Sequence, residues 1–571
     1  MHPLLLMLIV FVGYILMYRI YGRFISKKIF DISKRALVPS HEKNDGFDYV
    51  PTKKEIIFGH HFASIAGTGP IVGPAIAIIW GWVPAILWVF FGSIFIGAVH
   101  DFGVLITSMR NHGDSIASIT GRYINRRTKV FFFIIGFLEL WMFIAILGMV
   151  MAIIFSLYPG SVLPVWLEIP IAVLLGFMVY KKGKNYLSWS ILAIIVMYLT
   201  VILGKFIPIG LGDFFGLPHT GGWTIILLIY AFIASVLPVT TLLQPRDFIN
   251  SHQLLVAMGL MIVGVVVSSF SADFQMVAPA YNPDPSGAPS LWPFIFIIIA
   301  CGAVSGFHAI VSSGTSSKQV DNERDSLFVG YGSMLMEGAL ATLVILAVAA
   351  GIGMGYTDSN GEVLSGIPAW TSHYASWGQA KGLVPKISAF VDGSANMIAS
   401  TGLPKEYGLI IMGVFVASFA GTSLDTSTRL QRYFLHELFG KSIPVFRDKY
   451  FVSAFVVVSA AILAFASGAD GKGALLLWPL FGEINQVLAG LALLIVSIYL
   501  YGRGGRKWLF TGIPAIFMGI VTLWAAILNH FEFKNQQNVL LTVVNVIIII
   551  LAIWIIAEGV MKMIRFVRKP L

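Results

Sequence analysis

The segment FGHHFASIAGTGPIVGPAIA, from Phe58 to Ala77, decides how the rest of the chain is interpreted. It is apolar enough to lie in a bilayer, yet Gly67-Thr68-Gly69-Pro70 is expected to break it as a helix, as is Gly73-Pro74. A break exposed to lipid would leave backbone N–H and C=O groups without partners, so it persists only where it lines a polar cavity. In membrane carriers, unwound helices near the bilayer midplane hold substrates and coupling ions. The segment therefore predicts a carrier.

The composition places the chain in a membrane. Of its 571 residues 57% are hydrophobic and only 12% are charged, so we predict an all-α polytopic membrane protein with a single membrane domain over residues 1–571. The net charge of +10 comes from Lys and Arg in short loops, a pattern that reflects membrane orientation and not nucleic-acid binding. Cys301 is the only cysteine, so no disulfide within the chain is possible.

Apolar stretches long enough to cross a bilayer number about fifteen. They are expected at 3–25, 56–79, 83–110, 130–157, 165–181, 187–204, 222–243, 253–271, 293–314, 328–352, 405–425, 447–467, 475–498, 508–530 and 538–562. If the basic loops between them lie in the cytoplasm, the N-terminus is outside, and the C-terminus, with Arg565, Arg568 and Lys569, is inside. The same rule places 357–404 outside as a helical loop that caps the entrance, because a span at 386–401 would move the basic 429–447 loop outside.

A second apolar segment, GAVSGFHAIVSSG at 302–314, is interrupted in the same manner. An apolar helix with one buried acid follows each break, with Asp101 after the first and Glu337 after the second. The two broken spans run in opposite directions, and such inverted pairs indicate a transport site. The order of parts resembles the five-helix inverted repeat of LeuT-like transporters. The expected parts are a peripheral first helix at 3–25, a first repeat at 56–204, an inserted helix pair at 222–271, a second repeat at 293–498 and peripheral C-terminal helices at 508–562.

Several long motifs resemble those of the carbon starvation protein A family. They are FGHHFASIAGTGPIVGPA (58–75), GAVHDFG (97–103), LQPRDFIN (243–250), GAVSGFHAIVSSGTSSKQ (302–319), FAGTSLDTSTRLQRY (419–433) and LWPLFGEINQ (477–486). The resemblance implies a secondary carrier in a bacterial or archaeal inner membrane that imports di- and tripeptides when carbon is scarce. A close branch of the family imports pyruvate with protons, so pyruvate is the alternative substrate.

Substrate contacts are expected at the two breaks. Free N–H groups at broken helix ends bind carboxylates, and peptides and pyruvate both carry a carboxylate. The expected contacts are Gly67, Thr68, Gly69, Gly73, Ser305, Gly306, His308, Ser312 and Ser313. The alternative is that these small residues only let helices pack closely, as small residues do in membranes.

Acids inside spans are functional candidates because charge is costly to bury in a membrane. The candidate carriers of a coupling proton are Asp101, Glu337, Glu483 and His61; the alternative for the acids is a structural hydrogen bond or ion pair between helices. Thr422 and Ser423 form a possible cation site, against the alternative that Asp425 ends the helix at the cytoplasmic face, and the proton is preferred over sodium.

Further charged residues are assigned to the edges of the membrane. Glu168 is expected to reach the interface. Arg246 and Arg429 are expected to be cytoplasmic anchors, or to form gate ion pairs with Asp247 and Asp425.

His60 and His61 raise the question of a metal ion. Adjacent helical residues point about 100° apart, so these two cannot easily share one ion, and a gate, a proton relay or hydrogen-bonded packing is preferred. No metal or cofactor is expected, and the expected partners are a small-molecule substrate and the lipid bilayer.

Other classes of protein fit less well. The chain has no Walker A pattern for ATP-driven transport and no GxSxG nucleophile motif for an enzyme. A channel lined by the glycine-rich breaks, or a nutrient sensor that does not transport, remains an alternative.

Overall fold

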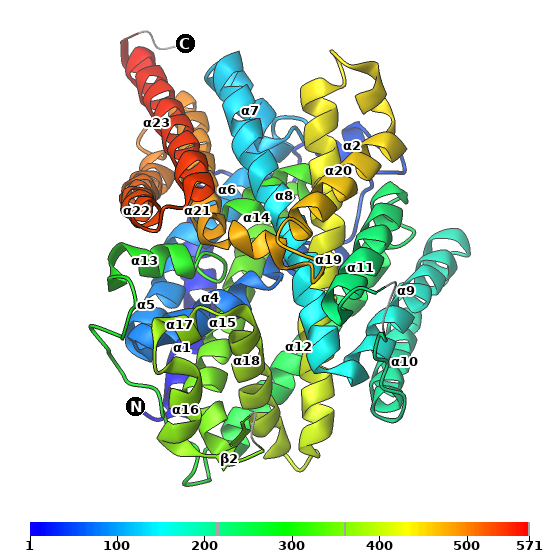
Figure 1. Ribbon diagram of the computed structural model, residues 1–571. Helices are drawn as coiled ribbons and strands as arrows, with labels where there is room; N and C mark the ends of the chain where they lie inside the picture. The colour runs from blue at the N-terminus through cyan, green and yellow to red at the C-terminus, as the bar shows by residue number, and fades with distance from the viewer. Residues whose placement is uncertain (213–215, 359–360, 569–571) are drawn as a thin grey trace.

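The computed structural model describes residues 1–212, 216–358 and 361–568, a bundle of helices (Figure 1). Its described strands, β1 (Tyr356–Thr357) and β2 (Val363–Leu364), form a short antiparallel ribbon. Figure 1 shows the two termini at opposite ends of the bundle, with the N-terminus at the end that also holds α16 and β2. The predicted topology places the N-terminus and the 357–404 loop on the same side of the membrane, and this requires both to lie at one end of the bundle. Lys569 and the loop residues 359–360 lie outside the described residues.

The helices before the second break have the bounds α1 (Pro3–Met17), α2 (Pro39–Glu42), α3 (Lys54–Ala66), α4 (Gly69–Ala77), α5 (Trp82–Gly92), α6 (Ala98–Met109), α7 (Ile116–Tyr123), α8 (Arg126–Leu157), α9 (Val162–Gly176), α10 (Tyr186–Phe206), α11 (His219–Val236), α12 (Leu243–Ser268) and α13 (Leu291–Ile298). Those after it are α14 (Gly306–Gly314), α15 (Ser333–Ala349), α16 (Gly366–Tyr374), α17 (Trp377–Ala380), α18 (Leu383–Ala399), α19 (Lys405–Phe439), α20 (Lys449–Ala464), α21 (Trp478–Gly502), α22 (Leu509–Asn535) and α23 (Val539–Arg568).

The number of membrane spans is slightly lower than expected. Within the described residues, 12 helices are long and apolar enough to cross a membrane, and α3 with α4 makes a thirteenth if a bent pair counts as one span. The second interrupted segment consists of two helices of 8 and 9 residues, α13 and α14, and α20 has 16 residues. The number of apolar stretches in the sequence exceeds the number of spanning helices because a break or a loop within a stretch shortens its helix.

The first segment breaks where its sequence predicts. α3 ends at Ala66, α4 begins at Gly69, and the two helices are bent by 44°. Gly67 has φ +25°, a conformation that residues with a Cβ rarely adopt. Pro70 stands in the first turn of α4, where its missing N–H removes no helical hydrogen bond. The second break covers residues 299–305, between α13 and α14.

Both helical spans that follow the breaks contain a π-helical segment. The segment η4 (Ser93–Gly97) joins α5 to α6, and η9 (Leu327–Gly332) leads into α15. Such segments insert a wider turn into an α-helix and are frequent at functional sites. Each is followed shortly by one of the predicted acids, Asp101 in α6 and Glu337 in α15. The sequence did not predict this shared feature.

The 357–404 loop is tied to the broken first helix. The hydroxyl of Tyr374, in α16, donates to the Ala75 carbonyl of α4 at 2.5 Å. The rings of Trp377 and Trp80 lie 5.5 Å apart between centroids. Lys386 of α18 has a buried side chain, and its Nζ lies 3.6 Å from the centre of the Tyr374 ring. The loop therefore covers the end of α4.

Candidate functional site

The two breaks are in direct contact. A Cβ placed on Gly69 would lie 2.4 Å from Sγ of Cys301, and one on Gly73 would lie 2.4 Å from the Ile298 carbonyl. A Cβ on Gly306 would meet the main-chain oxygen of α21 residue Asn485 at 2.2 Å. Glycine is therefore needed at all three positions for close backbone approach. Packing accounts for these glycines, and it brings the two unwound segments together.

The first break has unused hydrogen-bond donors. Thr68 does not cap α4 with its side chain, and within the described chain the N–H groups of Thr68 and Gly69 have no acceptor. On the other side of the break, the Ser423 hydroxyl of α19 donates to the Ser64 carbonyl in the last turn of α3 at 3.1 Å. The first turn of α4 therefore offers N–H groups and the positive end of a helix dipole to an anion.

At the second break, amide side chains of α21 bind the exposed backbone. Asn485 Oδ1 accepts a hydrogen bond from the Ser305 hydroxyl at 3.0 Å and another from the Phe307 N–H at 2.9 Å. Gln486 Nε2 donates to the Phe296 carbonyl of α13 at 2.8 Å and to the Val304 carbonyl within the break at 3.2 Å. Neither amide was among the site residues expected from the sequence. Their signal was an Asn-Gln pair inside an apolar span, in the motif LWPLFGEINQ.

A chain of buried ionisable side chains runs beside the second break. Nδ1 of His100 lies 2.7 Å from Asp101 Oδ1, and Asp101 Oδ2 lies 2.9 Å from His308 Nδ1. On the other side of the imidazole, His308 Nε2 lies 3.3 Å from Glu337 Oε2, and Glu337 Oε1 accepts the Gly302 N–H at 2.9 Å. The side chains of all four residues, His100, Asp101, His308 and Glu337, are 0% exposed. The two acids predicted separately, one after each break, thus converge on a single histidine.

Other predicted residues do not belong to this row of contacting ionisable side chains. Glu483 accepts a hydrogen bond from Asn529 of α22 at 3.0 Å. Ser313 accepts the Ile116 N–H at 3.0 Å and so ties α14 to α7. The Ser312 hydroxyl is buried and has no hydrogen-bond partner among the described residues. Ser312 therefore keeps a free polar group inside the protein, whereas Glu483 and Ser313 hold helices together.

The adjacent histidines of α3 face different elements. His60 Nδ1 lies 2.5 Å from Asp247 Oδ2 of α12. His61 Nδ1 lies 2.7 Å from the Ser316 hydroxyl, which follows α14. The two rings diverge as the helix geometry predicts.

A second charged network lies where α9, α12 and α19 meet, and here several predictions are wrong. Arg246, 1% exposed, donates to Glu168 Oε1 at 3.0 Å and to Asp425 Oδ2. The Tyr230 hydroxyl donates to the same Asp425 oxygen at 2.6 Å. Glu168 is therefore fully buried and does not reach the interface. Asp425 does not end its helix, since α19 continues to Phe439. The Asp425 carboxylate instead contacts buried side chains of neighbouring helices.

The predicted pairing of the charges is confirmed only for Arg246 with Asp425, whereas neither arginine pairs with Asp247 among the described ion pairs. Arg246 pairs with Asp425 and Glu168, whereas Arg429 pairs with Asp48, 3.4 Å away. Spacing along the chain cannot show which helices become neighbours, and it is the neighbour that sets the partner. At the predicted cation site, Thr422 accepts a hydrogen bond from Asn250 Nδ2 at 2.6 Å.

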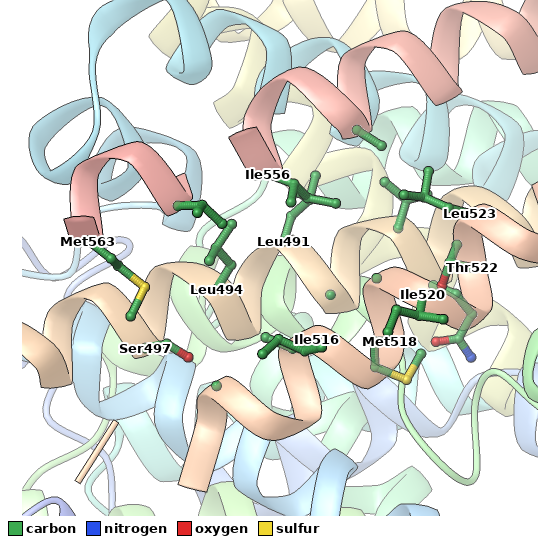
Figure 2. A pocket seen from close by; sticks show the side chains of 18 of the residues that line it. Leu491, Leu494, Ser497, Ile516, Met518, Ile520, Thr522, Leu523, Ile556 and Met563 are labelled. Carbon is green, nitrogen blue, oxygen red and sulfur yellow. The ribbon is translucent and has the colours of Figure 1, made fainter. Parts of the chain in front are cut away.

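A large groove contains none of the charged residues of either network in its lining. It has a volume of about 400 Å³ and is bordered by α21, α22 and α23. Figure 2 shows its apolar lining, which includes Leu491, Ile516 and Ile556. None of the predicted site residues lines it. Its chemistry suits hydrocarbon and not a charged solute.

Membrane-spanning helices, two broken helices in contact and buried charge beside the breaks define a multi-pass membrane protein built around a polar centre. The model of the carbon starvation protein CstA family matches residues 2–525. The chain belongs to this family, which confirms the resemblance seen in its motifs.

Named relatives are similar along most of their length. The peptide transporter CstA of Helicobacter pylori strain J99 is 32% identical, over 91% of this chain and 81% of the relative. The peptide transporter CstA of Bacillus subtilis strain 168 is 32% identical, over 97% of this chain and 96% of the relative. The pyruvate/proton symporter BtsT of Escherichia coli K12 is 30% identical, over 92% and 81%. A solved structure of MhsT with L-phenylalanine aligns with 82% of this chain and 98% of its own, at 12% identity and a TM-score of 0.46.

Proposed function

We propose that the protein is a secondary active transporter that imports di- and tripeptides across a bacterial or archaeal inner membrane when carbon is scarce. The observation that carries the proposal is the contact between two broken helices, with Gly69 of one against Cys301 of the other. Paired broken helices form midplane sites in transporters. Relatives named peptide transporter, at 32% identity over more than nine-tenths of the chain, support the substrate class.

In this proposal the first break receives the carboxylate of the substrate. The N–H groups of Thr68 and Gly69 have no acceptor within the described residues, and they stand at the positive end of α4. At the second break, Asn485 already accepts the Phe307 N–H at the start of α14. The carboxylate therefore binds where donors are free, and the Thr68 hydroxyl lies beside them.

The coupling ion in this proposal is a proton bound between Glu168 and Asp425. Two buried carboxylates face the one guanidinium of Arg246, and an unmatched buried charge is unfavourable. A proton on either carboxylate balances the group. Asp425 lies near the first break along α19, since Ser423 donates to the Ser64 carbonyl there. Proton loading and the geometry of the break are thereby linked.

Sodium is disfavoured by the hydrogen bonds of the predicted cation site. The Thr422 oxygen accepts a hydrogen bond from Asn250 at 2.6 Å, which occupies one of the lone pairs a cation would need. A hard cation needs several free oxygens. Proton transfer by Asp101, Glu337, Glu483 or His61 stays a prediction.

Pyruvate is the second candidate substrate. The pyruvate/proton symporter BtsT covers 92% of this chain at 30% identity, and pyruvate carries the same carboxylate.

Charge movement on a solid-supported membrane tests the proposal. Pulses of di- and tripeptides to reconstituted protein should give currents that grow with an inward proton gradient, and Asp425→Asn should remove that dependence. Glu532→Gln is the matched control, because Glu532 is an exposed acid of α22. Currents with pyruvate alone would select the second candidate, and folded protein silent to both solutes would refute the transport proposal. Flux far above carrier rates without counterflow would indicate a channel.

A further inference from the structure

We propose that the second break holds a transition-metal ion, coordinated by Cys301 Sγ, His308 Nε2 and Glu337 Oε2. We propose further that the carboxylate of the substrate completes the coordination of this ion. Only this second part rests on the proposed transport function.

The three ligand atoms are close enough to share an ion. The thiol sulfur, a ring nitrogen of the histidine and a carboxylate oxygen all lie within 4.8 Å of one another, and all three side chains are buried. Sulfur, nitrogen and oxygen ligands together suit zinc and related divalent ions. A tetrahedral zinc about 2.0–2.2 Å from both the nitrogen and the oxygen would hold those two atoms at roughly the 3.3 Å by which His308 Nε2 and Glu337 Oε2 are separated.

Two of these atoms have no other partner. In the described parts of the chain, His308 Nε2 and Glu337 Oε2 are fully buried and have no partner outside this group: they face each other at 3.3 Å, with the Cys301 thiol beside His308. Buried polar atoms in proteins almost always find a partner. A cation between this nitrogen and this oxygen satisfies both at once.

Each ligand is held in place by a neighbouring group. Asp101 Oδ2 lies 2.9 Å from His308 Nδ1. A proton on Nδ1 leaves the lone pair of the ring on Nε2, and histidine ligands of metals are commonly oriented by a carboxylate in this manner. The Gly302 N–H donates to Glu337 Oε1 at 2.9 Å, which leaves Oε2 for the ion. Asn485 Nδ2 lies 3.7 Å from Cys301 Sγ.

The ion would lie between the two breaks. Cys301 packs against Gly69, whose own N–H is a free donor in the described structure. Three protein ligands leave one position of a tetrahedral ion open, as in zinc sites that bind substrate. One oxygen of a substrate carboxylate can bind there while the other faces the first turn of α4. The ion thus joins the second break to the substrate bound at the first.

The ligand set differs from the histidine pair seen in the sequence. No metal was expected there because His60 and His61 diverge, and they do contact different elements. Cys301, His308 and Glu337 come from the break, from α14 and from α15, and only folding brings them together.

Cobalt binding tests the site directly. Full-length protein is purified in detergent, stripped with a chelator, reduced and titrated with Co²⁺. We expect saturation at one equivalent, with visible ligand-field bands and a sulfur-to-cobalt charge-transfer band. Because Cys301 is the only cysteine of the chain, that band reports this site alone.

Variants separate the roles of the residues. Cys301→Ser should remove the charge-transfer band, and Asp101→Asn should weaken Co²⁺ binding by about 10–100-fold, the usual effect of losing a group that orients a ligand. His252→Gln, at a half-buried histidine of α12 whose ring contacts the Phe248 carbonyl of its own helix, is the matched control and should bind Co²⁺ as the parent does. Helical circular dichroism and size-exclusion elution establish that each variant is folded.

The possible results decide between the parts of the proposal. Folded parent protein that takes up no Co²⁺, or a charge-transfer band that survives Cys301→Ser, overturns the metal site. Solute currents that are unchanged in metal-free protein overturn coordination of the substrate and leave the transport proposal standing. Saturable Co²⁺ binding in a protein that moves no solute supports the metal site and refutes the transport proposal.

Discussion

Replacing Arg246 by methionine tests the charged network at the junction of α9, α12 and α19. The substitution keeps an unbranched apolar stem and removes the guanidinium. Glu168 and Asp425, 0% and 1% exposed, then lose the cation they share. Loss of one partner from a buried ion pair costs about 3–5 kcal/mol, because the other charge stays buried. We expect Arg246→Met to lower the free energy of unfolding by about 3–5 kcal/mol. The loss does not double for the two carboxylates, because one of them can take up a proton and become neutral.

Equilibrium unfolding in mixed micelles, followed by tryptophan fluorescence, measures this loss. Arg506→Met, at an exposed arginine, is the matched control and should stay within about 0.5 kcal/mol of the parent. The triple variant with Arg246→Met, Glu168→Gln and Asp425→Asn should recover most of the loss, since no charge is then buried alone. An Arg246→Met protein as stable as the control would refute the reasoning. A triple variant as unstable as the single one would show that the packing of the arginine stem, and not its charge, stabilises the junction.

Three further predictions concern the first break and the outer loop. Thr68→Trp should abolish solute currents in protein that still elutes as folded, because Thr68 is 4% exposed inside the break; normal currents would contradict a substrate site there. Tyr374→Phe removes the 2.5 Å hydrogen bond to the Ala75 carbonyl and should destabilise the loop by about 0.5–1.5 kcal/mol, seen as faster amide hydrogen exchange in α16; unchanged exchange would show that the bond does not hold the loop. Burial lowers the pKa of Lys386 from its usual 10.5 to about 7. The unfolded chain therefore binds this proton more tightly, and the stability of the protein should rise with pH between these values. Lys386→Met should flatten that rise in thermal unfolding measured from pH 6 to 9, and an equal slope in both proteins would rule out this lysine as its source.

The breaks could be predicted because their causes are local. Gly67 and Pro70 act on the backbone of their own segment, whatever surrounds it. The positions of the buried acids were equally readable, since an acid inside an apolar span is visible in the sequence. That Asp101 and Glu337 would meet at one histidine was not, because this depends on how α6, α14 and α15 pack.

The remaining errors have the same origin. Glu168 stands near the start of the predicted span 165–181, but helix α9 begins already at Val162 and packs against α12 and α19, and the partner Arg246 lies far along the chain. The polar run after Thr422 was expected to end a helix because such residues commonly do. In the folded protein, Asp425 instead finds buried partners, and the helix continues.

The π-helical segments η4 and η9 set the direction in which Asp101 and Glu337 point. Such a segment amounts to one residue inserted into an α-helix. Deleting one residue from 93–97 would restore a regular helix and rotate Asp101 by about 100°, away from His308, while both flanking helices persisted. The same deletion in 327–332 would rotate Glu337 away. The extra residue in each π-helical segment therefore sets the rotational register on which one half of the polar centre depends.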